Sequence, residues 1–160
     1  MDNNEAIFYH EGKSVKIKGD SAFITRTRYA LMLLKQYYNH GLQIVLCYVN
    51  IIEQSEYSGI TNMEYCPTFK VGDRTSSADI TWYASCILHD SYHSKLFRDA
   101  RNAGKTYSQS YGEASGEKAE YKCLEEQIKA LNAMPTPQYV LEHAKKCRNS
   151  RWWENKKRDW

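Results

Sequence analysis

The segment Ser76–Gly104, SSADITWYASCILHDSYHSKLFRDARNAG, decides the fold of this chain. Ser76 and Asp79 have the spacing of a capping box, in which side-chain oxygens bind the first free amides of a helix. Gly104 supplies the left-handed residue that commonly ends a helix. We therefore predict one long helix that runs from Ser76 to about Asn102.

This helix carries the sequence His89-Asp90-Ser91-Tyr92-His93. Residues four apart on a helix are separated by about 400° of rotation, so the two imidazoles project from one face and can hold a single divalent metal. The same face is otherwise apolar and predicted to be buried, with Trp82, Cys86 and Leu96. The pattern therefore predicts half of a metal site, most simply a site for Zn²⁺.

Asp90 is the first candidate for a catalytic group. It follows His89 at the position where zinc hydrolases with an HExxH motif carry the glutamate that takes a proton from metal-bound water. The side chain of Asp90 is one methylene shorter than that glutamate. We predict Asp90 as the general base.

A third metal ligand is predicted on the next helix. Along that helix one stripe, within about 20° of a line, holds acidic and then apolar residues: Glu113, Glu117, Glu120, Leu124 and Leu131. An ionised carboxylate buried without a partner costs several kcal/mol, so an inward glutamate beside two histidines is explained best as a ligand. We predict Glu120, with Glu117 as the alternative, because acids in a first helical turn are also favoured by the helix dipole.

The region from Trp82 to Gln127 resembles the zincin-like metallopeptidases of gluzincin type, with an HDxxH variant of their HExxH motif. The apolar run before His89 and the segment Ala119–Cys123, similar to an AExxA segment with a later Gln127, carry this resemblance. It implies that His89, His93 and Glu120 bind zinc and that water takes the fourth position. It also implies a peptide or protein substrate lying against the edge of a small sheet.

The rest of the chain predicts an α+β fold with an N-terminal helix, a small β-sheet, the metal-binding helix and C-terminal helices. We expect a single domain over residues 1–148, of a size that buries one core. The predicted elements are a hairpin at 6–18 turning at Gly12, a helix from Ser21 to Gly41, a stretch at 42–52 ending as strand or forming a short helix, an edge strand at 65–71, a loop at 107–112, a helix from Ala114 to Pro135, and a helix at 138–148.

Composition narrows the class of protein. The five cysteines include no CxxC pair, so neither a disulfide framework nor a cysteine-rich zinc site is indicated, and the thiols are expected in the core. No apolar run approaches the roughly 18 to 20 residues of a membrane helix, and the N-terminus lacks the pattern of a signal peptide. These features predict a cytoplasmic protein without membrane contact.

Residues 149–160 form a basic, tryptophan-containing tail. Ala144–Trp160 holds seven of the 22 Lys and Arg residues and only two of the 19 acids, whereas the remainder is slightly acidic. Trp152, Trp153 and Trp160 with these cations suit contact with a nucleic acid or an acidic partner. The preferred alternative is a solvated helix end whose tryptophans cover the body.

Three functions follow from these observations. The first is a zinc-dependent hydrolase of amide bonds, for which Tyr92, Tyr107 and Tyr111 are hydroxyl donors by sequence proximity only, so packing is the preferred role of each. The second is an inactive metal-binding module with a protein or nucleic-acid partner. The third is an HD-type phosphohydrolase, for which His40 and Asp99 are poor additional ligands.

Overall fold

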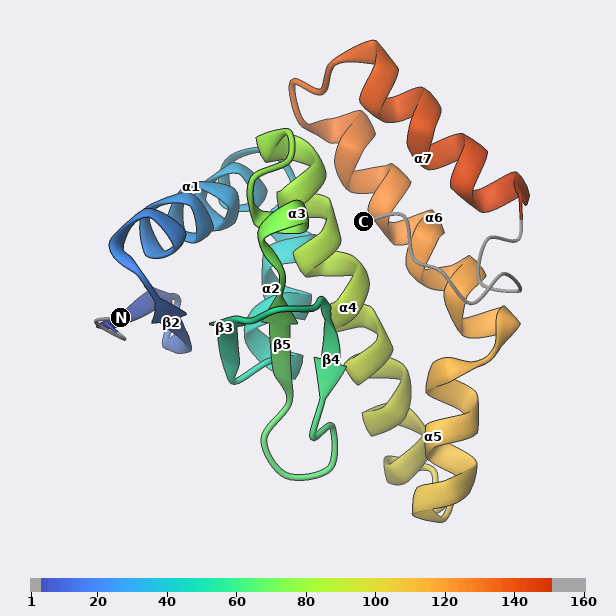
Figure 1. Cartoon of the computed structure of the whole chain (residues 1–160). Coiled ribbons are helices and arrows are strands. Elements are labelled where there is room, and N and C mark those ends of the chain that lie inside the picture. The colour runs from blue at the N-terminus through green and yellow to red at the C-terminus, as the bar shows by residue number, and fades with distance from the viewer. Residues whose placement is uncertain (1–3, 151–160) are drawn as a thin grey trace.

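The structure is a computed structural model that describes residues 4–150 (Figure 1). It is an α+β fold with a mixed sheet, as the sequence predicts. The elements in chain order are β1 (Asn4–His10), β2 (Lys13–Gly19), α1 (Ser21–Tyr37), α2 (Asn39–Tyr48), β3 (Ile51–Gln54), β4 (Gly59–Thr61), β5 (Thr68–Val71), α3 (Asp73–Ser76), α4 (Ile80–Asn102), α5 (Tyr107–Ser115), α6 (Glu117–Ala133) and α7 (Gln138–Ser150).

The N-terminal hairpin is confirmed. β1 and β2 pair antiparallel, and the turn residues Glu11 and Gly12 both have positive φ, of 49° and 76°. A two-residue turn of this hand matches the twist of the paired strands, and Gly12 adopts it without steric cost. The turn therefore fixes the register that places Val15 and Ile17 in the core.

The sheet has the strand order β1-β2-β3-β5-β4, with parallel pairing of β3 to both β2 and β5. The prediction of an edge strand at 65–71 is wrong in position, because Thr68–Val71 lies between β3 and β4. Pro67 precedes the strand, so its missing amide removes no bond from the ladder. The strand at this edge of the sheet is instead β4, at Gly59–Thr61.

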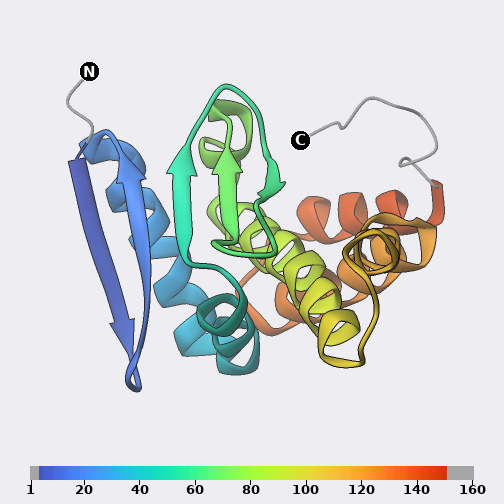
Figure 2. The same ribbon diagram turned by 90° about the horizontal axis from the view of Figure 1, so that it is seen from below.

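Helices pack on the inner face of the sheet, as Figure 2 shows for α1, α2 and α4. Alternate strand residues point to this face, and Ile17, Ile52 and Phe69 are each fully buried there. Lys16 and Lys18, on the opposite face of β2, are only half-buried. The alternation with period two thus gives the sheet one apolar side, on which the helices rest.

Helix α4 crosses the centre of the molecule and contacts α1, α2, α5 and α6. The prediction of its start at Ser76 is wrong by four residues, because Asp79 is the cap and its side chain accepts from the amides of Thr81 and Trp82. Ser76 ends the short helix α3 instead. The long helix is confirmed from Ile80 to Asn102, and every residue from Thr81 to Asp90 is buried.

The prediction that Gly41 ends the first helix is wrong. Helix α1 ends at Tyr37, and Gly41 lies in the first turn of α2. Helix α2 occupies most of the stretch 42–52, for which a strand and a short helix were the two predicted alternatives. A Cβ atom on Gly41 would lie 2.6 Å from Cδ1 of Tyr38 and 3.0 Å from Cδ2 of Leu88. Gly41 is needed because α2 packs closely against α4 at this point.

Gly41→Ala should therefore destabilise the protein by about 1–2 kcal/mol, since overpacking outweighs the better helix propensity of alanine. The ring of Tyr38 cannot turn aside freely, because its hydroxyl donates to Glu126 over 3.0 Å. Gly112→Ala is the matched control, being a helical glycine with open space where its Cβ would lie, and should stabilise by about 0.5–1 kcal/mol. Urea unfolding measures both; equal shifts of the midpoint would contradict the contact.

The chain after α4 differs from the prediction in two ways. The predicted loop at 107–112 belongs to helix α5, whose first turn is closed by a capping box between Thr106 and Gln109. The next helix, α6, begins at Glu117 rather than Ala114, because Gly116 is extended, with φ −82° and ψ 177°. The last helix, α7, agrees with the predicted helix at 138–148.

Candidate metal site

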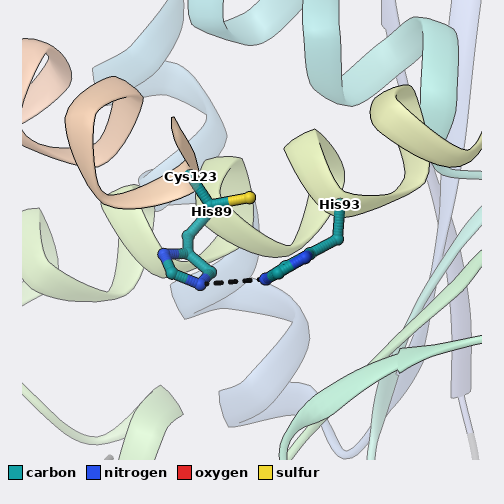
Figure 3. A group of neighbouring side chains, drawn as sticks. All are labelled: His89, His93 and Cys123. Carbon is teal, nitrogen blue, oxygen red and sulfur yellow. Dashed lines mark hydrogen bonds between the residues drawn. The ribbon is translucent and has the colours of Figure 1, made fainter. Parts of the chain in front are cut away.

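His89 and His93 lie one turn apart on α4 and are 3% and 4% exposed. Their Nε2 atoms face each other over 3.2 Å (Figure 3). The spacing of four residues brings the rings to one face, and the packing of α5 and α6 over α4 removes that face from water. The pair is therefore a buried site, as the apolar stripe predicts.

Hydrogen bonds on the far side of each ring fix which nitrogen carries the proton. Nδ1 of His93 lies 2.6 Å from the carbonyl oxygen of Ala114, which can only accept, so Nδ1 donates. Nδ1 of His89 lies 2.9 Å from Oε1 of Gln127. The amide of Gln127 donates through Nε2 to Ser85 Oγ, and Ser85 in turn donates to the carbonyl of Trp82. Both Nδ1 atoms are donors, so a ring that carries only this one proton points an Nε2 lone pair inward.

Glu120 joins the two histidines from α6. Its Oε2 lies 3.3 Å from Nε2 of His89, and its Oε1 lies 3.4 Å from Nε2 of His93. Burial alone would raise the pKa of this carboxyl, but its interactions with His89 and His93 outweigh burial and hold the pKa well below its usual range. Glu120 is therefore a buried carboxylate, and within residues 4–150 no lysine or arginine forms an ion pair with it.

The reason given for preferring Glu120 to Glu117 is wrong, although Glu120 does lie at the site. Because α6 starts at Glu117, both glutamates belong to its first turn. What separates them is orientation: Glu117 is exposed, whereas Glu120 is 6% exposed and faces α4. Glu113 is also exposed and lies on α5, so the single acidic stripe across 113–131 does not exist.

Cys123 is the residue that sequence reasoning missed. It follows Glu120 by one turn on α6, is fully buried, and lies beside the two histidines (Figure 3). One possible ligand atom from each of His89, His93 and Cys123 lies within 4.8 Å of the other two, so this cluster could hold a metal ion. Burial raises the pKa of its thiol. The spacing of three residues between Glu120 and Cys123 could have indicated that both side chains face α4 from the same side of the helix. The absence of a CxxC pair had removed the cysteines from the candidate ligands.

Asp90 adjoins His89 on α4 and is buried. It is 1% exposed, and its Oδ1 has no hydrogen-bond partner among the described residues. Its charge acts on the thiols of Cys86 and Cys123. Asp90 is thus a buried carboxyl on α4 rather than a solvent-exposed one.

A pocket of about 240 Å³ gives access to the other side of the site. It lies between the edge strand and the helices and is lined by residues 57–61 with His93, Ala114, Ser115 and Glu120. Of the tyrosines, Tyr57 borders the pocket, whereas Tyr92, Tyr107 and Tyr111 are not among its lining residues. Tyr107 instead packs on Phe97 and stacks with Tyr111.

The remaining predicted site residues lie elsewhere. His40 and Asp99 are exposed, and Asp99 pairs with Lys95, so neither joins the metal cluster. Residues 151–160, with Trp152, Trp153 and Trp160, lie outside the described residues. No helix within residues 4–150 has the length and apolar character needed to cross a membrane.

The histidines, the carboxylate, the thiol and the adjacent pocket together form a candidate metal centre on α4 and α6. Comparisons with protein families, with curated proteins and with solved structures find no match to this chain.

Proposed function

We propose that this protein is a zinc-dependent hydrolase of amide bonds in peptides, with His89, His93 and Glu120 as the zinc ligands. The observation that carries the proposal is the convergence of two inward imidazole lone pairs and one buried carboxylate on a single point. Without an ion, protons on the histidines satisfy these contacts: the two Nε2 atoms share a hydrogen bond, and the histidines hold the pKa of Glu120 below its usual range. A cation at that point would take the place of those protons and compensate the burial of the carboxylate.

The separations are compatible with zinc. Donors bound at about 2.0–2.1 Å in a tetrahedron lie about 3.3 Å apart. The two Nε2 atoms lie 3.2 Å apart, and a different oxygen of Glu120 lies 3.3 Å from His89 and 3.4 Å from His93. Two imidazoles and one carboxylate also form a donor set found in catalytic zinc sites, which keep a fourth position for water.

The roles of the residues follow from this arrangement. Bound zinc supplies an acidified water and polarises a carbonyl oxygen. Gln127 and the Ala114 carbonyl hold the imidazoles in the required tautomer and orientation. Asp90 accepts the proton of the attacking water, for which its Oδ1 has an unused acceptor site.

The edge of the sheet provides the binding surface for substrate. β4 pairs only with β5 among the described strands, so its other side offers backbone amides and carbonyls. An extended peptide adds to such an edge as a further strand. Residues 57–61 line the pocket that also contains His93 and Glu120, so a peptide bound there has its backbone beside the metal ligands.

The test is metal content together with hydrolysis. Purified protein should contain about one zinc per chain and should cleave an unstructured protein substrate until a chelator removes the metal, with activity restored by zinc. A protein that neither contains nor takes up a divalent metal would falsify the proposal. In that case a proton shared among His89, His93 and Glu120 would explain their contacts.

Glu120→Gln should weaken zinc binding by about 100-fold or more, because the site loses its anionic ligand and keeps the size of the side chain. Glu117→Gln is the matched control: the same change one turn away, on an exposed residue, should leave the affinity within a factor of about two. Competition with a chromogenic chelator measures both constants. A larger effect at Glu117 would transfer the ligand role to it.

One observation favours a second candidate, a metal-binding module without hydrolytic activity. Asp90 does not line the pocket that opens on His93 and Glu120. Bound zinc with no hydrolysis of amide substrates would support this candidate, and the same metal measurements identify it.

A further inference from the structure

The thiol of Cys123 lies on the inner side of the proposed zinc site. Glu120 and Cys123 are three residues apart on α6, so both side chains face α4 from consecutive turns. Cys123 is fully buried, and its sulfur fits with one nitrogen of each histidine within 4.8 Å. A thiolate and two imidazoles are ligands that zinc accepts together.

The sulfur of Cys123 does not line the pocket beside the proposed metal site. The pocket is lined by His93 and Glu120 but not by Cys123 or Asp90. Asp90 and Cys123 are both buried and neither lines the pocket, so both lie on the enclosed side of the site. The water that Asp90 is to deprotonate must occupy the same enclosed side. Cys123 and that water therefore compete for one coordination position.

We propose that Cys123 is the fourth protein ligand of the ion at rest, so that the site is closed by two nitrogens, one oxygen and one sulfur. This inference rests on the proposed function, because it concerns the same ion. When the sulfur–metal bond forms, the thiol releases its proton to solvent, and no oxidant or reductant is needed. The bond must break, and the thiolate must take up a proton, before water binds on the side of Asp90. The arrangement lowers the activity of the resting protein and makes Cys123 the residue that controls access of water to the metal.

The test replaces zinc by cobalt, whose bond to a thiolate gives an intense charge-transfer band in the near ultraviolet. The cobalt-loaded protein should show this band, and Cys123→Ala and Cys123→Ser should lose it while still binding one cobalt per chain. Cys47→Ser is the matched control, since Cys47 is an exposed thiol on α2, and should keep the band. The serine variant preserves the size of the side chain in case the alanine variant fails to fold.

The outcomes separate this inference from the proposed function. Bound cobalt without the band in the unmodified protein overturns the ligand role of Cys123 alone. Absence of bound cobalt overturns both proposals. With the band present, zinc-loaded Cys123→Ala should hydrolyse peptide faster than the unmodified protein, and an unchanged or lower rate overturns the closed resting state. The band without hydrolysis in any variant supports the ligand assignment and refutes the peptidase.

Discussion

A variant with both His89→Ala and His93→Ala is expected to lose zinc completely, from about one ion per chain to a level below detection. The two imidazoles supply both neutral donors of the site. Within the described residues, no third histidine belongs to the metal cluster. A carboxylate and a thiol alone leave the ion with half of the donors that zinc requires. This is the largest effect on metal binding that any substitution in the chain should produce.

The loss should appear in stability as well as in metal content. Zinc at about 100 times its dissociation constant stabilises a protein that binds it only when folded by about 2.7 kcal/mol. The melting temperature of the metal-free protein should therefore rise on addition of zinc, and that of the double variant should not. The control is His40→Ala with His143→Ala, because both histidines are exposed and lie on other helices. A double variant at 89 and 93 that still contains stoichiometric zinc would remove these residues from the site.

Asp90→Asn is expected to retain zinc and to lower hydrolysis by about 100- to 10,000-fold, the usual contribution of a general base. The amide has the size of the carboxylate, so the packing between α4 and α6 should survive, but it cannot accept the proton of the attacking water. Steady-state kinetics on a peptide substrate and metal analysis of the same preparation separate the loss of the base from the loss of the metal. Equal turnover in the variant would exclude Asp90 as the base.

Asp99→Asn is the matched control on the same helix. Asp99 is exposed and pairs with Lys95, so its substitution should change neither metal content nor turnover. Asp90→Glu is the informative companion, since it restores the reach of the usual HExxH glutamate. Its extra methylene must fit at a position that is 1% exposed, so we expect turnover at or above the original level together with a loss of about 1–3 kcal/mol in stability. Lower turnover in a folded, zinc-loaded Asp90→Glu would show that reach does not limit the reaction.

Local patterns predicted the central helix well because they depend on neighbours along the chain. The apolar period from Trp82 to Phe97 identifies α4 and its buried face, and the side chain of Asp79 caps it, within a few residues of the predicted start. Gly12 likewise fixes the hairpin, since positive φ is a property of the residue itself. Gly41 misled the prediction, because its role is to admit Tyr38 and Leu88, which a sequence does not bring together.

Some residues of the candidate site can likewise be identified from the sequence alone, and others only from the tertiary structure. His89 and His93 follow from spacing on one helix, so the sequence alone identifies the pair and its burial. Glu120 required a choice among acids that only the break at Gly116 and the docking of α6 on α4 resolve, because that break separates Glu113 from the helix and turns Glu117 outward. Glu120 faces the histidines, although α6 begins at Glu117 and not at Ala114, the start on which its prediction depended.

By itself, the sequence determined the α+β class, the long helix Ile80–Asn102 and the two histidines on its buried face, since turn geometry, capping and helical periodicity act over a few residues. Only the tertiary structure decided that Cys123 lies beside those histidines, that Asp90 is buried, and that β4 rather than β5 lies at an edge of the sheet. These features depend on how α6 packs on α4 and how β5 inserts between β3 and β4. The physical reason is that burial is shared between distant segments, and no local propensity specifies which segments share it.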